Sequence, residues 1–135
     1  MSGRPSKRAL TRLLGGSRFV RGYGFALVAA DLDSCTISMP YRRALERPGG
    51  TVNGPAFMAA AYCAMWLAIK CHIGLEHDAV TSELNTAFLN AARRETVYCT
   101  ARILKLGKRI IYGTAECHDR RGKLFTHHSV TYARI

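Results

Sequence analysis

The feature that most constrains the fold is an uncharged, apolar segment in the middle of the chain. Residues 51–69 carry no charge, and their apolar part runs from Ala56 to Ile69. That part is shorter than the ~20 apolar residues that a membrane-spanning helix needs. Alanines are interleaved with large side chains on several faces, a pattern typical of a helix enclosed by other structure. The segment therefore predicts a buried central helix and not a membrane anchor.

The ends of this helix are marked by residues with known preferences. Asn53 can cap the first turn, and Pro55 suits a first-turn position because it needs no hydrogen-bond acceptor there. Gly74 is a typical residue just past a helix end. The sequence predicts a helix from Gly54 to Ile73.

Segments rich in β-branched and aromatic residues surround the helix. Two precede it, at 24–32 and 34–40, and four follow it, at 79–89, 96–105, 109–118 and 123–135. Gly-containing links of hairpin length join the last three segments. An antiparallel sheet of about six strands must cover one apolar face, and one long helix is available to cover it. The pattern predicts an α+β fold of this kind.

The N-terminal region is strongly basic. Ser6 before KRALTRLL and the stop at Gly15-Gly16 predict a short helix. The formal net charge is +11, and six basic residues come before the first acid, Asp31. We expect residues 1–21 to be a basic arm with a short helix, either solvated or facing a polyanion, and residues 22–135 to be the main domain.

Charge and cysteine usage limit the function classes. The chain has no aromatic RNA-binding signature, zinc-finger spacing or helix-turn-helix pattern, so its charge alone does not favour nucleic acid as a partner. The five cysteines are odd in number and form no CxxC pair, which favours reduced thiols in the cytoplasm. The Cys-His and His-His neighbours lack the spacing of metal ligands, and no metal is expected.

Four sequence motifs, in the same order along the chain, resemble those of a known family. They are RPGGTVNGPAFMA at 47–59, VTSELNTAFL at 80–89, RILKLGKR at 102–109 and HSVTYA at 128–133. Together they resemble the hotdog-fold acyl-CoA thioesterases of the phenylacetate-pathway type, over residues 20–135. The resemblance implies a hotdog fold, in which a sheet of about six strands wraps one long helix. It also implies a homodimer or homotetramer with acyl-CoA pockets between subunits. Coenzyme A would be part of the substrate, and no separate cofactor is expected.

The resemblance places a catalytic group at the start of the helix. The Gly54 N–H would donate to the thioester carbonyl, since backbone N–H groups at a helix N-terminus lack intrahelical partners. Asn53 would orient the substrate. Thr81 stands where relatives keep a hydroxyl that positions water, and Tyr62 stands where they keep a helix carboxylate. A purely structural reading of Gly54 as a tight-turn residue remains open.

The missing carboxylate is the main departure from the family pattern. Tyrosine ordinarily ionises only near pH ~10, so position 62 offers a poor general base. Cys63 next to it fits better as a small buried hydrophobe. By strand alternation Glu83 should share a face with Thr81 and Asn85, which makes Glu83 the nearest candidate for a displaced base.

The coenzyme A side of the resembled site is better preserved. Lysines and arginines are the expected partners of phosphate oxygens, although charged hairpin tips are also common without any ligand. The expected coenzyme-binding residues are Phe88, Asn90, Arg93, Lys105, Gly107, Lys108 and Arg109.

These observations predict an acyl-CoA thioesterase-like protein that hydrolyses or binds a thioester. The alternative from another class is a non-catalytic acyl-CoA or acyl-group binding protein that has lost its carboxylate. A nucleic-acid-associated scaffold would rest only on the charge of +11. A hotdog hydratase is disfavoured, because it needs a polar acid/base pair that this helix lacks.

Overall fold

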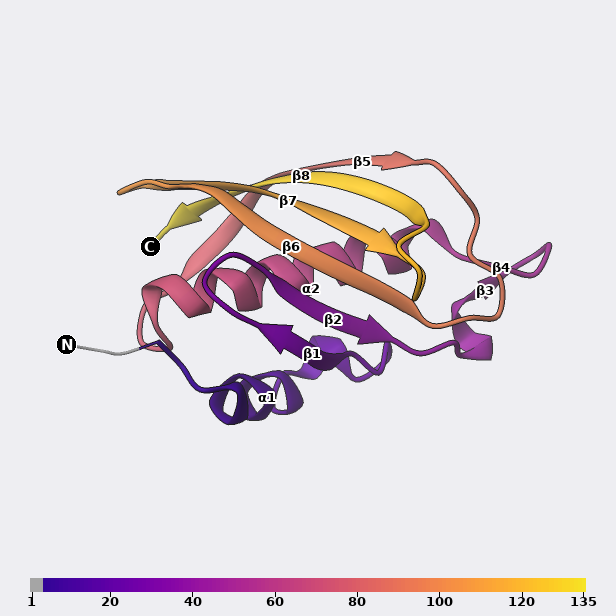
Figure 1. The fold of residues 1–135 in the computed structure, drawn as a ribbon, viewed down its shortest axis with the longest axis horizontal. Coiled ribbons are helices and arrows are strands. Elements are labelled where there is room, and N and C mark those ends of the chain that lie inside the picture. Colours follow the sequence, from indigo (N-terminus) through magenta and orange to yellow (C-terminus); the bar gives the residue numbers. More distant parts are fainter. Residues whose placement is uncertain (1–3) are drawn as a thin grey trace.

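The computed structural model describes residues 4–135, and its centre is a curved antiparallel sheet wrapped around one helix (Figure 1). The six strands lie in the order β1-β2-β6-β7-β8-β5, and each pairs antiparallel with its neighbours. This is the hotdog arrangement that the sequence predicted. The strands are β1 (Ala26–Ala30), β2 (Cys35–Met39), β5 (Ala79–Phe88), β6 (Val97–Leu106), β7 (Ile110–His118) and β8 (Leu124–Arg134).

The central helix α2 spans Gly54–Ile73, as predicted. The Asn53 side chain caps it by accepting a hydrogen bond from the Ala56 N–H at 2.9 Å. Its alanines at 56, 60, 61 and 64 are fully buried, which lets the helix backbone approach the sheet closely. The helix is long and apolar enough to cross a bilayer, but most of it is enclosed by the sheet. Its apolar surface is therefore used inside the domain.

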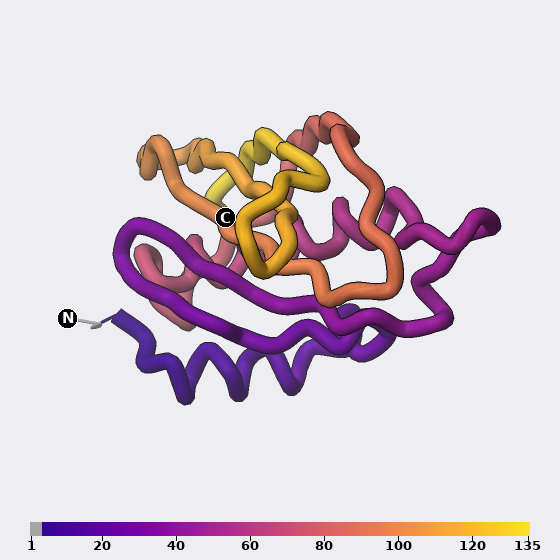
Figure 2. The backbone as a smooth tube through the Cα atoms, turned by 45° about the vertical axis from the view of Figure 1, so that its right-hand side comes forward, coloured from indigo at the N-terminus to yellow at the C-terminus, as the bar shows by residue number. Residues whose placement is uncertain are grey.

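The two edge strands of the sheet differ in whether other parts of the chain cover them. The helix α1 (Lys7–Gly15) lies along β1 and buries Leu10 and Leu14 in the core (Figure 2). Arg4 Nη2 donates to the Ala30 carbonyl at 2.7 Å and Lys7 Nζ to the Val28 carbonyl at 3.1 Å. The β1 edge is thus covered by the N-terminal segment. At the opposite edge, β5 has a neighbouring strand on one side only among the described residues.

A bulge in β5 corrects one expectation. Thr81 pairs with Tyr132, but Glu83 pairs with Thr131, so the register shifts by one residue at Ser82. The extra residue sends Thr81 toward the helix side and Glu83 toward the outer face. The expectation that Glu83 and Asn85 share a face with Thr81 was wrong, because simple alternation holds only for an unbroken ladder.

The sequence reading missed a small substructure beside the start of α2. The 3₁₀ turn η2 (Arg43–Leu45) leads into a two-stranded sheet of β3 (Glu46–Arg47) and β4 (Thr51–Val52). A bridge joins Thr51 to Arg93, and the Arg93 guanidinium donates to the Gly49 carbonyl at 3.5 Å. A further 3₁₀ turn, η1 (Arg18–Val20), follows α1. These contacts hold the residues after β5 against the turn that enters α2.

Candidate functional site

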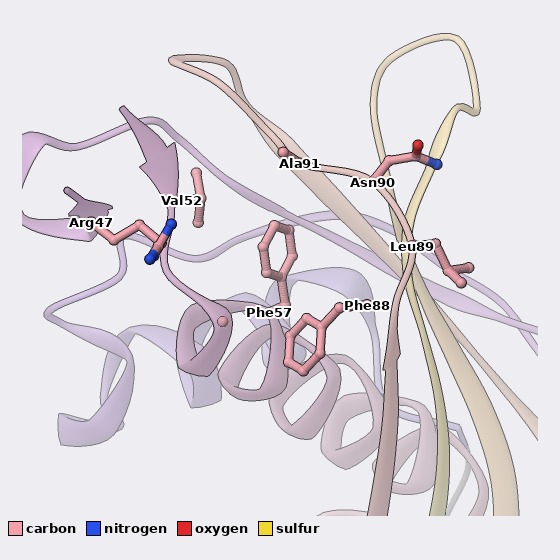
Figure 3. Close-up of a pocket in the computed structure, with 8 residues that line it drawn as sticks. Arg47, Val52, Phe57, Phe88, Leu89, Asn90 and Ala91 are labelled. Atoms are coloured by element: carbon pink, nitrogen blue, oxygen red, sulfur yellow. The ribbon is translucent and has the colours of Figure 1, made fainter. Parts of the chain in front are cut away.

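A hollow of about 320 Å³ lies where α2 begins, between the β3–β4 hairpin and the chain that leaves β5 (Figure 3). Its walls are mostly apolar, with one amide and one guanidinium, a composition typical of ligand sites. The structure brings three predicted site residues together here: Gly54, Phe88 and Asn90. The lining residues are Arg47, Val52, Gly54, Phe57, Phe88, Leu89, Asn90 and Ala91.

Gly54 provides the polar backbone group of this hollow. It is the first residue of α2, and none of the hydrogen bonds among the described residues uses its N–H. A Cβ at this position would lie 3.2 and 3.3 Å from two ring carbons of Phe88. Glycine therefore leaves space between the helix start and that ring. A carbonyl that enters this space can accept the free N–H at the positive end of the helix dipole.

Asn53 and Asn90 use their amides to hold the local backbone. Asn53 accepts from the Ala56 N–H and donates from Nδ2 to the Leu45 carbonyl at 2.8 Å. Asn90 Nδ2 donates to the Leu124 carbonyl at 2.8 Å. These bonds give both side chains a positioning role at the hollow, and direct contacts with a ligand remain predictions.

Tyr62 and Thr81 do not line the hollow. Tyr62 is half-exposed on α2, where its ring lies 5.4 Å from Phe19 and 6.4 Å from Tyr132. The Tyr132 hydroxyl donates to the Tyr62 carbonyl, and burial raises the pKa of Tyr132. Thr81 Oγ1 is buried and has no hydrogen-bond partner among the described residues. The two residues thus lie beside Tyr132, in a different part of the chain from the hollow.

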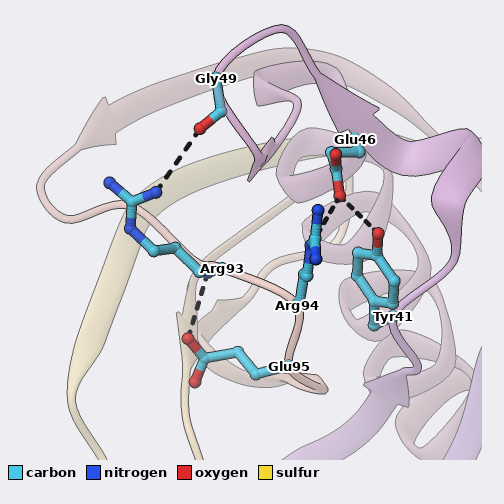
Figure 4. Close-up of polar contacts among 6 residues, drawn as sticks. All are labelled: Tyr41, Glu46, Gly49, Arg93, Arg94 and Glu95. Carbon is cyan, nitrogen blue, oxygen red and sulfur yellow. Dashed lines mark hydrogen bonds and ion pairs between the residues drawn. The ribbon is translucent and has the colours of Figure 1, made fainter.

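No carboxylate of the described residues lines the hollow, and the nearest acid in sequence is engaged elsewhere. Glu46 accepts hydrogen bonds from the Tyr41 hydroxyl and from Arg94 Nε, the latter at 3.4 Å (Figure 4). The Tyr41 hydrogen bond, followed by the charge of Arg94, lowers the pKa of Glu46 below its ordinary value. A carboxylate with a lowered pKa and two donors is a weak proton acceptor, so Glu46 is poorly suited to act as a general base.

The predicted coenzyme-binding residues fall into two groups that lie far apart in one chain. Phe88, Asn90 and Arg93 lie at the end of β5 beside α2's start, whereas the β6–β7 hairpin lies at the opposite end of the sheet (Figure 1). Lys105, Lys108 and Arg109 belong to that hairpin. Glycine at position 107 is explained by the local packing of the hairpin, because a Cβ there would lie 2.5 Å from the Ile110 carbonyl oxygen.

Arg47 is a residue of the hollow that the sequence reading did not single out. It stands on β3, and its side chain extends beside Val52 into the region faced by Phe57 (Figure 3). Arg47 lies two residues before a Gly-Gly pair, which indicates a turn. The strands on either side of this turn have only two residues each, too few to show a strand pattern. Only the fold shows that the guanidinium comes back to the helix start.

The wrapped helix and the hollow at its N-terminus define this chain as a hotdog-fold protein of the thioesterase class. The family model of the Thioesterase superfamily matches residues 49–126, which is more than half of the chain. The chain belongs to this superfamily. The match covers the turn into α2, the whole helix, strands β5 to β7 and the first three residues of β8.

Individual relatives support the same assignment. A Thermoplasma acidophilum protein named as a candidate esterase, Ta0293, is 26% identical over 91% of this chain and 92% of its own length. The conserved protein PA5202 of Pseudomonas aeruginosa has 26% identity and a TM-score of 0.85, over 92% of this chain and 98% of that one. The thioesterase HI1161 of Haemophilus influenzae has a TM-score of 0.89 at 22% identity, over 97% and 91% of the two chains. At that identity the last likeness concerns the fold.

Proposed function

We propose that this protein binds an acyl-CoA thioester with its carbonyl at the Gly54 N–H, and that it hydrolyses the ester slowly. The observation that carries the proposal is the unpaired Gly54 N–H at the mouth of an apolar hollow. Such a donor stabilises the oxyanion that forms when a thioester carbonyl is attacked. The acyl chain would lie against the rings of Phe57 and Phe88. Membership of the thioesterase superfamily supports this choice of substrate class.

The site would be completed by a second copy of the chain. Within residues 4–135 no strand lies beside the β5 edge, whereas Arg4, Lys7 and α1 block the β1 edge. Exposed strand edges favour pairing. In a twofold antiparallel pairing of β5, the end of one strand lies opposite the start of the other. The second copy's Thr81 would then approach the hollow that begins at Phe88.

The same pairing would unite the two separated groups of basic residues. The β6–β7 hairpin lies at the end of the sheet where β5 begins, since Ile111 is next to Tyr132 and Tyr132 is next to Thr81. A second copy's Lys105, Lys108 and Arg109 would therefore lie on the same side as Arg93 of the first. This arrangement would place cations along the phosphates of one coenzyme A.

Slow hydrolysis is expected because no carboxylate among the described residues lines the hollow. General-base assistance is typically worth ~100-fold or more, and no carboxylate among the described residues lines the hollow. Water held by Tyr62 of a second copy would have to attack without that assistance, because the Thr81 hydroxyl is buried in its own chain. The same observation favours a second candidate, a non-catalytic acyl-CoA binding protein. Both candidates share the ligand and differ only in turnover.

One experiment separates the two candidates. A panel of acyl-CoA chain lengths would be tested for binding by calorimetry and for free-thiol release on the same protein. Binding with thiol release above the buffer rate supports slow hydrolysis, and binding with none supports the non-catalytic candidate. Failure to bind any acyl-CoA would contradict the proposed function.

A complementation experiment tests whether the site spans two subunits. A Gly54→Val chain and a chain with Lys105→Glu, Lys108→Glu and Arg109→Glu would be expressed separately and together. If each site takes Gly54 from one copy and the hairpin from the other, mixed dimers regain one intact site. Random mixing then restores roughly a quarter of all sites. If the whole site lies in one chain, mixing restores no site.

A further inference from the structure

Arg47 is the only charged side chain that lines the hollow, and its guanidinium has no partner among the described residues. None of the hydrogen bonds or ion pairs of residues 4–135 involves its side chain, and a Cβ added at Gly49 in the turn would lie 4.0 Å from its Nη1. A guanidinium carries five donors in a fixed plane. Arg47 is exposed to solvent, so these donors are open to a ligand in the hollow that Gly54 and the apolar walls also line.

The two arginines of the loop after β5 have protein partners, whereas Arg47 has none among the described residues. Arg94 pairs with Glu46, and Arg93 donates to the Gly49 carbonyl (Figure 4). Glu95 accepts from the Arg93 backbone N–H at 3.2 Å. Both nearby carboxylates are therefore engaged on the other side of the β3–β4 hairpin. The charge of Arg47 is left for something that enters the hollow.

We propose that Arg47 selects acyl groups that end in a carboxylate. This inference rests on the proposed function, because it takes the thioester carbonyl to lie at the Gly54 N–H. The planar guanidinium fits a carboxylate with two parallel hydrogen bonds. Val52, Phe57 and Phe88 would contact the methylene groups between the two ends of the acyl chain. The substrate class is then the CoA thioester of a short dicarboxylic acid.

The coenzyme phosphates are a less suitable partner for Arg47. Arg47 and Gly54 line one hollow of about 320 Å³, so they are within the reach of a single short acyl group. In acyl-CoA the pantetheine arm separates the phosphates from the thioester carbonyl. A carbonyl at Gly54 therefore brings the acyl chain, and not the nucleotide, to Arg47.

A matched pair of ligands tests the proposal. Glutaryl-CoA and 5-methylhexanoyl-CoA differ only in a terminal carboxylate and a terminal isopropyl group of similar shape, and they carry the same phosphates. Their dissociation constants would be measured by calorimetry on the full chain at fixed ionic strength. We expect the parent to bind glutaryl-CoA roughly tenfold more tightly, as for a charged hydrogen-bonded contact.

Two variants test whether Arg47 causes the preference for glutaryl-CoA. Arg47→Gln should remove the preference by weakening glutaryl-CoA binding while leaving 5-methylhexanoyl-CoA binding unchanged. Arg94→Gln removes the same charge from the neighbouring loop and should leave the ratio as in the parent. Thermal unfolding of each variant confirms that it is folded.

The outcomes separate this inference from the proposed function. If the parent binds 5-methylhexanoyl-CoA as well as glutaryl-CoA, the inference is overturned and acyl-CoA binding stands. If Arg47→Gln weakens both esters equally, Arg47 contacts the coenzyme, which also overturns the inference. If the parent binds neither ester nor any other acyl-CoA, the proposed function itself fails.

Discussion

Replacing Gly54 by valine is the sharpest test of where the thioester carbonyl lies. The φ angle of Gly54 is not in the positive region, so valine can adopt the backbone conformation. Its Cβ would come within 3.2 Å of the Phe88 ring, and that side chain is 57% exposed and free to shift. Loss of glycine flexibility in the unfolded chain offsets part of the steric cost. We expect the free energy of unfolding to change by no more than about 1 kcal/mol.

The effect on function should be much larger than the effect on stability. The valine side chain would fill the space that a carbonyl needs to reach the Gly54 N–H. Loss of one oxyanion donor lowers turnover by about 100- to 1,000-fold. Any thiol release should therefore fall at least ~100-fold, with a comparable weakening of acyl-CoA binding if the parent does not turn over.

The assay needs a folded variant and a matched control. Circular dichroism with thermal unfolding would report folding, and calorimetry and thiol release would report function. Gly22→Val is the control, because a Cβ there meets nothing within 4 Å and its φ is not positive. A folded Gly54→Val protein that binds acyl-CoA as tightly as the parent would refute the placement of the carbonyl.

Three further changes probe the rest of the site and the core. Charge reversal at Lys105, Lys108 and Arg109 should weaken CoA-ester binding more than pantetheine-ester binding, with a difference that shrinks as salt is added; equal losses would show a structural role. Tyr62→Asp should raise thioester hydrolysis at least tenfold if a second copy brings position 62 to the carbonyl, and slower hydrolysis by a folded variant would contradict this. Burial raises the pKa of Cys35 to about 12, so this thiol stays protonated at pH 8. All five cysteines are buried, so the native protein should show no rapidly reacting thiol toward Ellman's reagent, and fast native labelling would contradict that buried placement.

These tests all concern a hollow with no acid among its described lining residues. The fold retains the helix N-terminus, the hollow and the cations, while the described residues of the hollow include no acid. Binding does not require an acid, because the N–H donor and the apolar walls do not depend on a base. The balance between binding and turnover is therefore a property of individual side chains and not of the fold.

The sequence by itself determined the elements and their order. Helix α2 begins and ends where Asn53, Pro55 and Gly74 predicted, because capping and turn chemistry are local. The later strands lie within one or two residues of their predicted ranges, because β-branched runs and Gly-containing links are also local signals. Local rules suffice when each residue's preference agrees with the global fold.

Local rules failed where the ladder became irregular or a strand became very short. Thr81 and Glu83 lie on opposite faces because one extra residue at Ser82 shifts the register, and no composition signal marks that bulge. The two-residue strand that carries Arg47 is too short to show alternation. Its pairing depends on Thr51, which a bridge fastens to Arg93 on a loop distant in sequence.

Only the tertiary structure decided which predicted site residues meet. It brought Gly54, Phe88 and Asn90 into one hollow and added Arg47, and it left Tyr62 and Thr81 in a different part of the chain. It also sent the hairpin at 105–109 to the far end of the sheet from Phe88. The physical reason is that residue type and spacing encode the local conformation, whereas neighbours in space are set by strand order, register and the packing of the sheet on α2.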